Sequence, residues 1–155
     1  MKVKPKNAAN LLFSSTSLGY VYFEAIANSI DAGASEITIA IQISSFTEAE
    51  TLRTSTSDNG KGFDEASFNR FSNLLDRSDP QHKGIGRLVY LSYFSEIFVN
   101  SAFGMQRRHF IFNDEFDGDC TLKDLDEESY STVIEYGGCL YPGSSGFSWR
   151  RGRIS

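Results

Sequence analysis

Residues 17–44 have the sequence SLGYVYFEAIANSIDAGASEITIAIQIS, whose periodicity changes once and so predicts two elements. Apolar side chains recur at helical spacing through residues 17–32, and Gly33 stands where such a helix would end. From 36 to 44, isoleucine occupies alternate positions, which is typical of a strand with one buried face. The segment therefore predicts a helix, a short glycine turn and a strand.

Three polar residues of the expected helix, Glu24, Asn28 and Asp31, are spaced i, i+4 and i+7 and therefore share one face. The amide oxygen of Asn28 is a suitable ligand for Mg²⁺, which prefers oxygen donors. A carboxylate one helical turn away, at Glu24, can hold a water molecule and accept its proton. Taken alone, the three residues are better explained as an ordinary solvent-facing polar stripe.

Residues 58–63, DNGKGF, follow a second candidate strand. A carboxylate such as Asp58, at the end of a strand, can accept a hydrogen bond from an exocyclic amine. Gly60 and Gly62 would let a flat ring approach the backbone closely. Asp-Asn-Gly is also a strong turn sequence, so a plain β-turn is the simpler explanation when the motif stands alone.

Residues 83–87, KGIGR, begin the next apolar segment. Backbone N–H groups at a helix N-terminus, with the positive end of the helix dipole, form a natural phosphate site. Lys83 and Arg87 could add charge-assisted contacts. The motif is not a P-loop, because GxxxxGK[ST] is absent, and Val89 stands where a dinucleotide fingerprint requires glycine.

The order of the three motifs carries more weight than any one of them. EAIANSIDAGASEITIAI, DNGKGF and KGIGRL resemble, in this order, the three boxes of the GHKL superfamily: the ATP-binding domains of gyrase B, heat-shock chaperones, histidine kinases and MutL. The likeness covers about residues 17–94. The first motif is most similar to the MutL, MORC and chaperone-type ATPases, because an acidic residue precedes an asparagine by four and DAGA closes the helix.

Weaker patterns complete the expected order of elements. Residues 1–10 are polar and are expected to be a frayed lead-in. Further elements are expected as strands at 51–57 and 131–136, a strand hairpin at 96–102 and 107–113 turning at Gly104, and helices from 64 or 65 and over 84–94. This order favours an α/β (α+β) two-layer sandwich, with helices on one face of a mixed, largely antiparallel sheet. The resemblance implies the same architecture, the Bergerat-type ATP-binding fold.

The resemblance also implies roles for individual residues. Glu24 would be the general base that activates the attacking water, and Asn28 would ligate the Mg²⁺ that bridges the phosphates. Asp58 would accept the amino hydrogen of adenine, and residues 64–83 would form a lid. The other residues expected at the ATP site are Asp31, Gly60, Gly62, Phe63, Lys83, Gly84, Ile85, Gly86, Arg87 and Thr132.

The expected function is a Mg-ATP-binding domain with slow or partner-dependent ATP hydrolysis, in which nucleotide closes the lid and joins two domains into a homodimer. Relatives that hydrolyse ATP usually carry a second domain with a lysine for the γ-phosphate, so a missing C-terminal domain or a protein partner is expected. Two alternatives stay open. One is a histidine kinase catalytic domain, against which the DAGA ending argues, and the other is a nucleotide-binding interaction module without hydrolysis.

The bulk composition is compatible with this function and excludes others. The 155 residues suit one domain, with a core at about 10–137 and an irregular tail, or the start of a missing region, at 138–155. The net charge of −5 does not indicate a nucleic-acid surface. Two cysteines and two histidines lack the paired short spacing of a zinc site. No membrane span or secretory signal is visible, so the protein is expected to be soluble and cytoplasmic.

Overall fold

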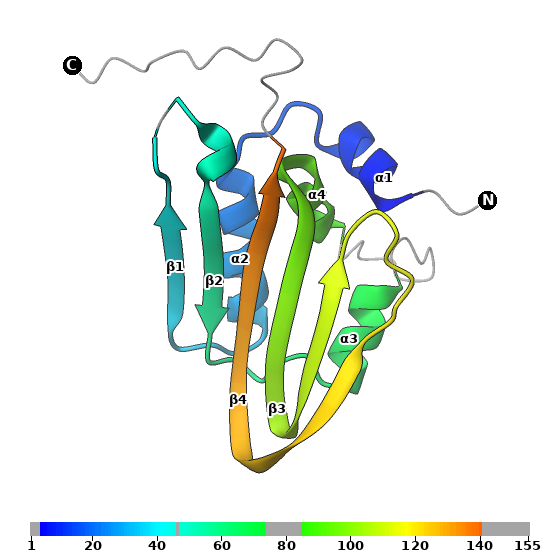
Figure 1. The fold of residues 1–155 in the computed structure, drawn as a ribbon. Helices are drawn as coiled ribbons and strands as arrows, with labels where there is room; N and C mark the ends of the chain where they lie inside the picture. Colours follow the sequence, from blue (N-terminus) through cyan, green and yellow to red (C-terminus); the bar gives the residue numbers. More distant parts are fainter. Residues whose placement is uncertain (1–3, 46, 74–84, 141–155) are drawn as a thin grey trace.

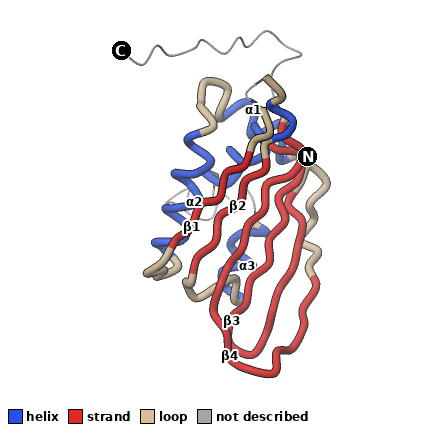
Figure 2. Tube along the Cα trace, turned by 60° about the vertical axis from the view of Figure 1, so that its left-hand side comes forward, coloured by secondary structure: helices blue, strands red, loops and turns tan. Residues whose placement is uncertain are grey.

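The computed structural model describes residues 4–45, 47–73 and 85–140. Within these ranges the chain forms a two-layer α+β sandwich, in which helices cover one face of an antiparallel sheet (Figures 1 and 2). The fold class predicted from the sequence is confirmed. The elements in chain order are α1 (Pro5–Leu12), α2 (Gly19–Asp31), β1 (Ile37–Gln42), the 3₁₀ turn η1 (Ala49–Thr51), β2 (Arg53–Asp58), α3 (Glu65–Ser72), the 3₁₀ turn η2 (Gly86–Val89), α4 (Tyr90–Tyr93), β3 (Phe94–Phe112) and β4 (Thr121–Cys139).

Helix α2 and strand β1 follow the signals of the opening segment. The helix is capped at its end by Ala32, and Gly33 adopts a φ of 77°, a left-handed conformation that glycine reaches without strain. Strand β1 then pairs antiparallel with β2, and Ile37 lies opposite Asp58. The backbone N–H of Lys61 donates to the carbonyl of Ala32 at 3.0 Å. These contacts place the DNGKGF turn directly beside the end of α2.

The sheet has the strand order β1-β2-β4-β3, and every neighbouring pair is antiparallel. Strand β3 reverses at Gly104, whose φ is 65°, and its second half runs back beside the first (Figure 1). The Arg108 guanidinium therefore lies 5.3 Å from the centre of the Phe103 ring. In a continuous extended strand, two residues five positions apart would be separated by about 16 Å, so the contact between Arg108 and Phe103 agrees with the reversal. The hairpin expected to turn at Gly104 is confirmed.

The expectation that residues 1–10 form a frayed lead-in is wrong from Pro5 onward, and residues 1–3 lie outside the described residues. Helix α1 begins at Pro5, in the first turn where the missing N–H of proline costs no hydrogen bond. Ala8 and Ala9 are buried in the core. Two small side chains give too weak an apolar pattern for the helix to be recognised from sequence, although they allow its backbone to pack closely.

Two further expectations need correction at element boundaries. The helix expected over 84–94 is not one regular helix in its described part, 85–94, because η2 and the single-turn helix α4 share it and Phe94 already begins β3. The last strand starts at Thr121, well before the expected segment 131–136. Its first half is rich in acidic residues and mostly exposed, and it is a strand because it pairs with the reversed half of β3.

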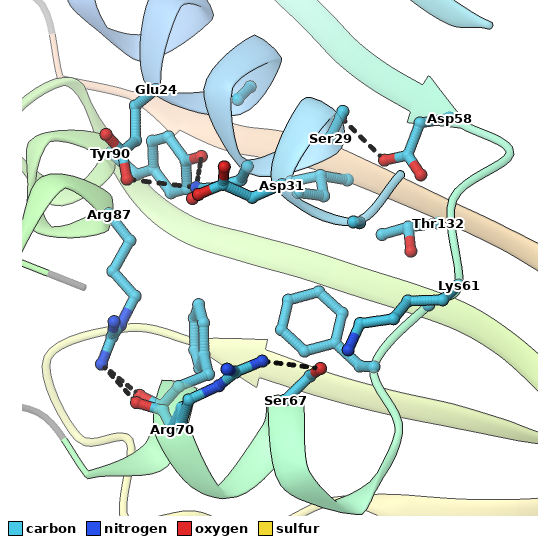
Figure 3. Close-up of a pocket in the computed structure, with 17 residues that line it drawn as sticks. Glu24, Ser29, Asp31, Asp58, Lys61, Ser67, Arg70, Arg87, Tyr90 and Thr132 are labelled. Carbon is cyan, nitrogen blue, oxygen red and sulfur yellow. Dashed lines mark hydrogen bonds between the residues drawn. The ribbon is translucent and has the colours of Figure 1, made fainter. Parts of the chain in front are cut away.

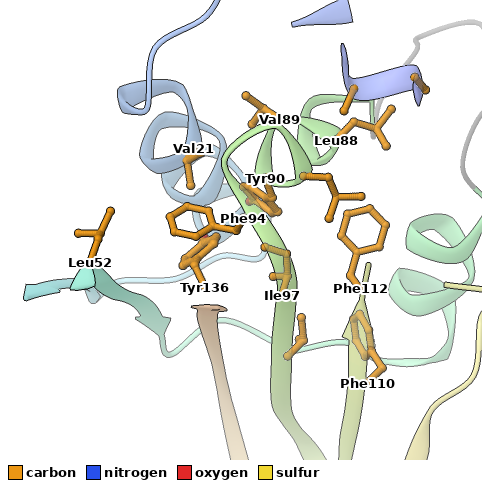
Figure 4. Packing of buried hydrophobic residues seen from close by; sticks show 14 of the residues in the cluster. Val21, Leu52, Leu88, Val89, Tyr90, Phe94, Ile97, Phe110, Phe112 and Tyr136 are labelled. Atoms are coloured by element: carbon orange, nitrogen blue, oxygen red, sulfur yellow. The ribbon is translucent and has the colours of Figure 1, made fainter. Parts of the chain in front are cut away.

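The main core lies between the sheet and helices α1, α2 and α4 (Figure 4). Val21 from α2, Leu88 from η2, and Phe94 and Ile97 from β3 are fully or almost fully buried. Each such burial stabilises the fold by about 1.5–3 kcal/mol. None of the helices in the described ranges is long and apolar enough to cross a membrane.

A group of aromatic rings attaches α3 to the reversed half of β3. The Phe71 ring centre lies 5.2 Å from that of Phe110 and 5.1 Å from that of Phe112. The Phe68 and Phe110 ring centres are 5.1 Å apart. Such pairs contribute about 0.5–1.5 kcal/mol each beyond their buried area. They fix α3 over the sheet, facing α2 across a gap that contains the candidate site.

Strand β2 is polar in sequence but buried on the face that carries the helices. Thr54 and Thr56 are buried, and both hydroxyls have partners. The Thr54 hydroxyl donates to the Ala40 carbonyl at 3.0 Å, and the Thr56 hydroxyl lies 3.3 Å from that of Tyr136. Because each buried hydroxyl is hydrogen-bonded, the polar strand can be buried without a large desolvation penalty.

Candidate functional site

A cavity of about 550 Å³ lies between α2, the sheet and α3 (Figure 3). Its size falls in the range typical of small-molecule sites. Eight of the residues expected at the site line it, namely Glu24, Asn28, Asp31, Asp58, Gly62, Phe63, Arg87 and Thr132. Gly60, Ile85 and Gly86 lie outside this lining, and Lys83 and Gly84 fall outside the described residues.

The carboxylate of Asp58 is held by two hydrogen bonds at the end of β2. One oxygen accepts from the Ser29 hydroxyl at 2.9 Å, and the other accepts from the backbone N–H of Gly60 at 2.9 Å. A carboxylate oxygen has two lone pairs, so each oxygen can accept a further hydrogen bond from the cavity. Ser29, which the sequence motifs did not identify, is buried on the sheet-facing side of α2.

A chain of hydroxyl groups connects the sheet to the DNGKGF turn. Thr132 lies opposite Asp58 in the β2–β4 register, and its hydroxyl is 2.9 Å from that of Ser101 on β3. The Ser101 oxygen also accepts from the backbone N–H of Phe63 at 2.9 Å and donates to the Ser131 carbonyl at 3.1 Å. These bonds fix the turn against the sheet, and Ser101 was not found from sequence because only the strand register brings it here.

The two glycines of the turn are required by the protein's own packing. Gly62 has a φ of 76°, and a Cβ atom there would lie 2.4 Å from the Ala102 carbonyl oxygen. A Cβ atom at Gly60 would lie 2.9 Å from the Cβ of Ala32. The turn therefore packs against β3 and the end of α2 through its glycines. The expected approach of a ring to these glycines stays a prediction.

We expect Gly62→Ala to lower the free energy of unfolding by about 2 kcal/mol, because the new methyl group meets a backbone carbonyl and the left-handed conformation is strained. Gly33→Ala is the matched control: its φ is 77°, but nothing lies within 4 Å of the added Cβ. It should lose only about 1 kcal/mol, the cost of the conformation alone. Urea unfolding of both variants measures the difference. Equal losses would contradict the packing argument.

At the other end of the cavity, the Asn28 side-chain amide connects Glu24 to Tyr90. Its nitrogen donates to a Glu24 carboxylate oxygen at 3.1 Å and lies 3.3 Å from the Tyr90 hydroxyl. With its nitrogen turned this way, the Asn28 oxygen is the atom left for a ligand. A Cβ atom at Gly86 would overlap the Glu24 carboxylate, so the glycine leaves the space that this carboxylate fills.

Burial sets the protonation behaviour of Glu24. Desolvation raises the pKa of its carboxyl above the ordinary value, while the hydrogen bond from Asn28 and the charge of Arg87 act in the opposite direction. The raised pKa brings the carboxylate closer to the range in which a general base works well. Tyr90, fully buried beneath it, has a pKa raised well above normal by the same desolvation and stays neutral.

Arg87 joins η2 to the end of α3. Its guanidinium donates to the carbonyls of Phe71 at 2.5 Å and Arg70 at 3.2 Å, and it stands 4.6 Å from the Phe71 ring centre. Desolvation lowers its pKa to about 10, so it remains charged at neutral pH. A cation at the carbonyl end of a helix is favourable. Arg87 therefore supports α3, and its expected contact with phosphate stays a prediction.

Two further cations reach the cavity from residues that sequence motifs did not select. Lys61 lies 3.5 Å from Asp64, and Arg70 donates to the Ser67 hydroxyl at 3.3 Å. Lys61, Arg70 and the buried Arg87 all line the cavity, which suits an anionic ligand. In the part of the chain that the structure describes, no group of three or more His, Cys, Asp or Glu residues could hold a metal by itself.

Comparison with known proteins identifies the family. Residues 16–128 match the family described as histidine kinase-, DNA gyrase B- and HSP90-like ATPase. The chain belongs to this ATPase family. Membership supports the binding of ATP in a domain of this kind, which agrees with the three motifs and with the cavity between α2 and the sheet. No curated protein matches the chain.

Solved structures share the fold of this ATPase-family domain. The N-terminal domain of a DNA repair protein is similar with a TM-score of 0.55 and 18% identity, over 85% of this chain and 38% of the other. The 43K ATPase domain of Thermus thermophilus gyrase B, in complex with an aminocoumarin, gives a TM-score of 0.55 and 16% identity, over 90% of this chain and 39% of the other. The chain thus spans less than two fifths of these solved chains.

Proposed function

We propose that this domain binds Mg-ATP in the cavity and hydrolyses it slowly, with Glu24 as the general base. The observation that carries the proposal is the placement of two polar groups in one cavity. The doubly hydrogen-bonded carboxylate of Asp58 lies at one end, and the Glu24–Asn28 pair lies at the other (Figure 3). Both groups are fixed by their neighbours before a ligand binds, which lowers the cost of binding.

The Asp58 end fits an adenine ring. Its carboxylate can accept the exocyclic amino hydrogen, directly or through a water molecule, on the lone pairs that Ser29 and Gly60 leave available. Phe63 and Ile134 add apolar area to the lining of the same cavity. A site built to accept a hydrogen bond from an amine discriminates strongly against a base that lacks one.

The Glu24 end fits the phosphates and their magnesium ion. One protein oxygen, that of Asn28, is a sufficient protein ligand, because Mg²⁺ in nucleotide sites completes its shell with water and phosphate oxygens. When bound, Mg²⁺ would neutralise charge on the phosphates. Glu24 would orient the attacking water and accept its proton, and Asn28 would keep Glu24 in place through its amide nitrogen. Lys61 and Arg70, at the cavity wall, would attract the polyanion.

Helix α3 would act as the first part of the lid. It forms the wall opposite α2 and is joined to η2 by Arg87, so a change at the phosphate end could reach it through that side chain. Residues 74–83 of the expected lid lie outside the described residues. Lid closure and nucleotide-dependent dimerisation are proposed on family grounds. A second domain that supplies a lysine to the γ-phosphate is proposed because the chain spans less than two fifths of its solved relatives.

Thermal unfolding with and without ligand tests the binding step. We expect a non-hydrolysable ATP analogue with Mg²⁺ to raise the melting temperature, because a ligand that binds only the folded state stabilises it by mass action. GTP should give a much smaller rise if the amino group of adenine is what Asp58 recognises. No rise at millimolar ATP analogue with Mg²⁺ would contradict the proposal, whereas equal rises with both nucleotides would contradict the adenine assignment alone.

A further inference from the structure

Two segments that are distant in the sequence meet at the Glu24 end of the cavity with the same spacing. Glu24 and Asn28 are four residues apart on α2, while Gly86 begins η2 and Tyr90, four residues later, begins α4. A Cβ atom at Gly86 would overlap the Glu24 carboxylate, and the Tyr90 hydroxyl lies 3.3 Å from the Asn28 side-chain nitrogen. The glycine therefore leaves space for the carboxylate, and the tyrosine contacts the amide.

The Tyr90 hydroxyl is held in place by the packing of its ring. Only 2% of Tyr90 is exposed, and its ring meets that of Tyr136 edge to face, with the ring centres 5.4 Å apart. Tyr136 is fixed in turn, because its hydroxyl lies 3.3 Å from that of Thr56 and its ring centre lies 5.2 Å from that of Phe94. In such a packed core the Tyr90 ring has little room to move, so its hydroxyl reaches the cavity lining at a fixed point (Figure 3).

The Asn28 side chain needs partners to set the direction of its oxygen, because the last bond of an asparagine side chain rotates over a broad range. Its nitrogen carries two hydrogens, and each has an acceptor: a Glu24 carboxylate oxygen at 3.1 Å and the Tyr90 hydroxyl at 3.3 Å. An ionised carboxylate only accepts, so it requires the nitrogen on its side, and the second hydrogen bond then fixes the plane of the amide. The oxygen is left for a ligand in the cavity that Asn28 lines.

We propose that Tyr90 is a positioning residue for magnesium, whose hydroxyl fixes the Asn28 amide with its oxygen turned toward the metal of Mg-ATP. This inference rests on the proposed function, in which the Asn28 oxygen is the protein ligand of Mg²⁺. Groups that hold a metal ligand in its productive direction are commonly needed for full metal affinity. Tyr90 would contact neither the metal nor the reacting atoms, and its effect would pass through Asn28.

The enhancement of nucleotide affinity by Mg²⁺ tests this role. Isothermal titration with a non-hydrolysable ATP analogue is carried out in excess Mg²⁺ and again in EDTA, and the ratio of the two dissociation constants defines the magnesium enhancement. Tyr90→Phe keeps the buried ring and removes only the hydroxyl. It should reduce the magnesium enhancement about tenfold and change the affinity in EDTA by less than about threefold. A tyrosine that merely filled the core would change both affinities alike.

Tyr93→Phe is the matched control. Tyr93 lies on the same helix, and its hydroxyl donates to the Thr16 carbonyl at 2.6 Å, so this substitution also removes a hydrogen bond made by a tyrosine hydroxyl. Because Tyr93 does not line the cavity, the magnesium enhancement should be unchanged. In an Asn28→Ala background, which lacks the proposed ligand, Tyr90→Phe should have no further effect on the enhancement, since the two residues act through one interaction.

Hydrogen exchange of the wild-type Asn28 side chain tests the contact without a substitution in the core. Because both hydrogens are bonded, the NH₂ group of Asn28 should exchange with water more slowly than that of Asn100, an exposed asparagine of β3 that does not line the cavity. The NMR signals of Asn28 are assigned by their loss in Asn28→Ala. Equal exchange rates would overturn the proposal even if Tyr90→Phe did not fold.

Two further results would overturn the proposal: a folded Tyr90→Phe protein with the magnesium enhancement of the wild type, or an equal loss of the enhancement in Tyr93→Phe. In both cases the wild type would still bind Mg-ATP, so the proposed function would stand. A wild type that binds no nucleotide, or binds it equally well with and without Mg²⁺, would instead refute the magnesium site and the role of Tyr90 with it.

Discussion

Asp58→Asn should weaken ATP binding by about 100-fold, corresponding to about 2.7 kcal/mol. The carboxylate accepts from Ser29 and from the backbone of Gly60, and it would accept from adenine as well. An asparagine has one acceptor oxygen and an NH₂ group, which cannot accept the adenine amino hydrogen. The backbone N–H of Gly60 and the adenine amino group, which only donate, would then share the single amide oxygen, and the negative charge that strengthens both hydrogen bonds would be lost. Isothermal titration with a non-hydrolysable analogue and Mg²⁺ measures the loss.

Asp126→Asn is the matched control for this change. Asp126 is exposed on β4 and does not line the cavity, so the same substitution there should leave affinity unchanged. Unfolding of Asp58→Asn must be measured alongside, because the variant also disturbs the Ser29 and Gly60 contacts in the free protein. A folded Asp58→Asn protein that binds ATP like the wild type would remove Asp58 from the site and with it the proposed orientation of the nucleotide.

The residues that could be predicted from sequence share a property: their roles are encoded within short segments. The helix face of Glu24, Asn28 and Asp31 follows from spacing alone, and all three line the cavity. The left-handed glycine at the end of α2 and the isoleucine alternation of β1 are equally local. In each case neighbouring residues in the chain are sufficient to set backbone conformation and side-chain direction, so a single sequence contains the information.

The residues that were missed depend on pairing between distant segments. Ser101 supports the site because it lies opposite Thr132 in the β3–β4 register. Arg70 lines the cavity because aromatic rings fix α3 over the sheet. Tyr90 meets Asn28 although 62 positions separate them. The exposed first half of β4 is a strand through its partner rather than through its own acidic sequence. Such features become visible only when the whole topology is known, because tertiary contacts override local propensity.

The proposed role of Glu24 as general base predicts a large effect on the rate of ATP hydrolysis. Glu24→Gln should reduce the single-turnover rate of ATP hydrolysis by about 100-fold or more while changing ATP affinity by less than about threefold. Glutamine matches the shape of the side chain and can still bond to Asn28, but its amide cannot accept a proton from water. Glu135→Gln, on an exposed part of β4 outside the cavity, should leave both quantities unchanged. If hydrolysis needs a second domain or a protein partner, the rates of the wild type and both variants are measured with that domain or partner present.

The pH dependence of the same rate separates a base from a positioning group. Burial raises the pKa of Glu24, and below that pKa the protonated carboxyl cannot accept a proton from the attacking water. The wild-type rate should therefore rise with pH, with a midpoint above the ordinary glutamate value of 4.5, and then level off. The residual rate of Glu24→Gln should lack this acid limb. A limb that survives the substitution would assign the titration, and the role of base, to another group. ATP binding without turnover in the wild type would instead favour the interaction module that does not hydrolyse ATP.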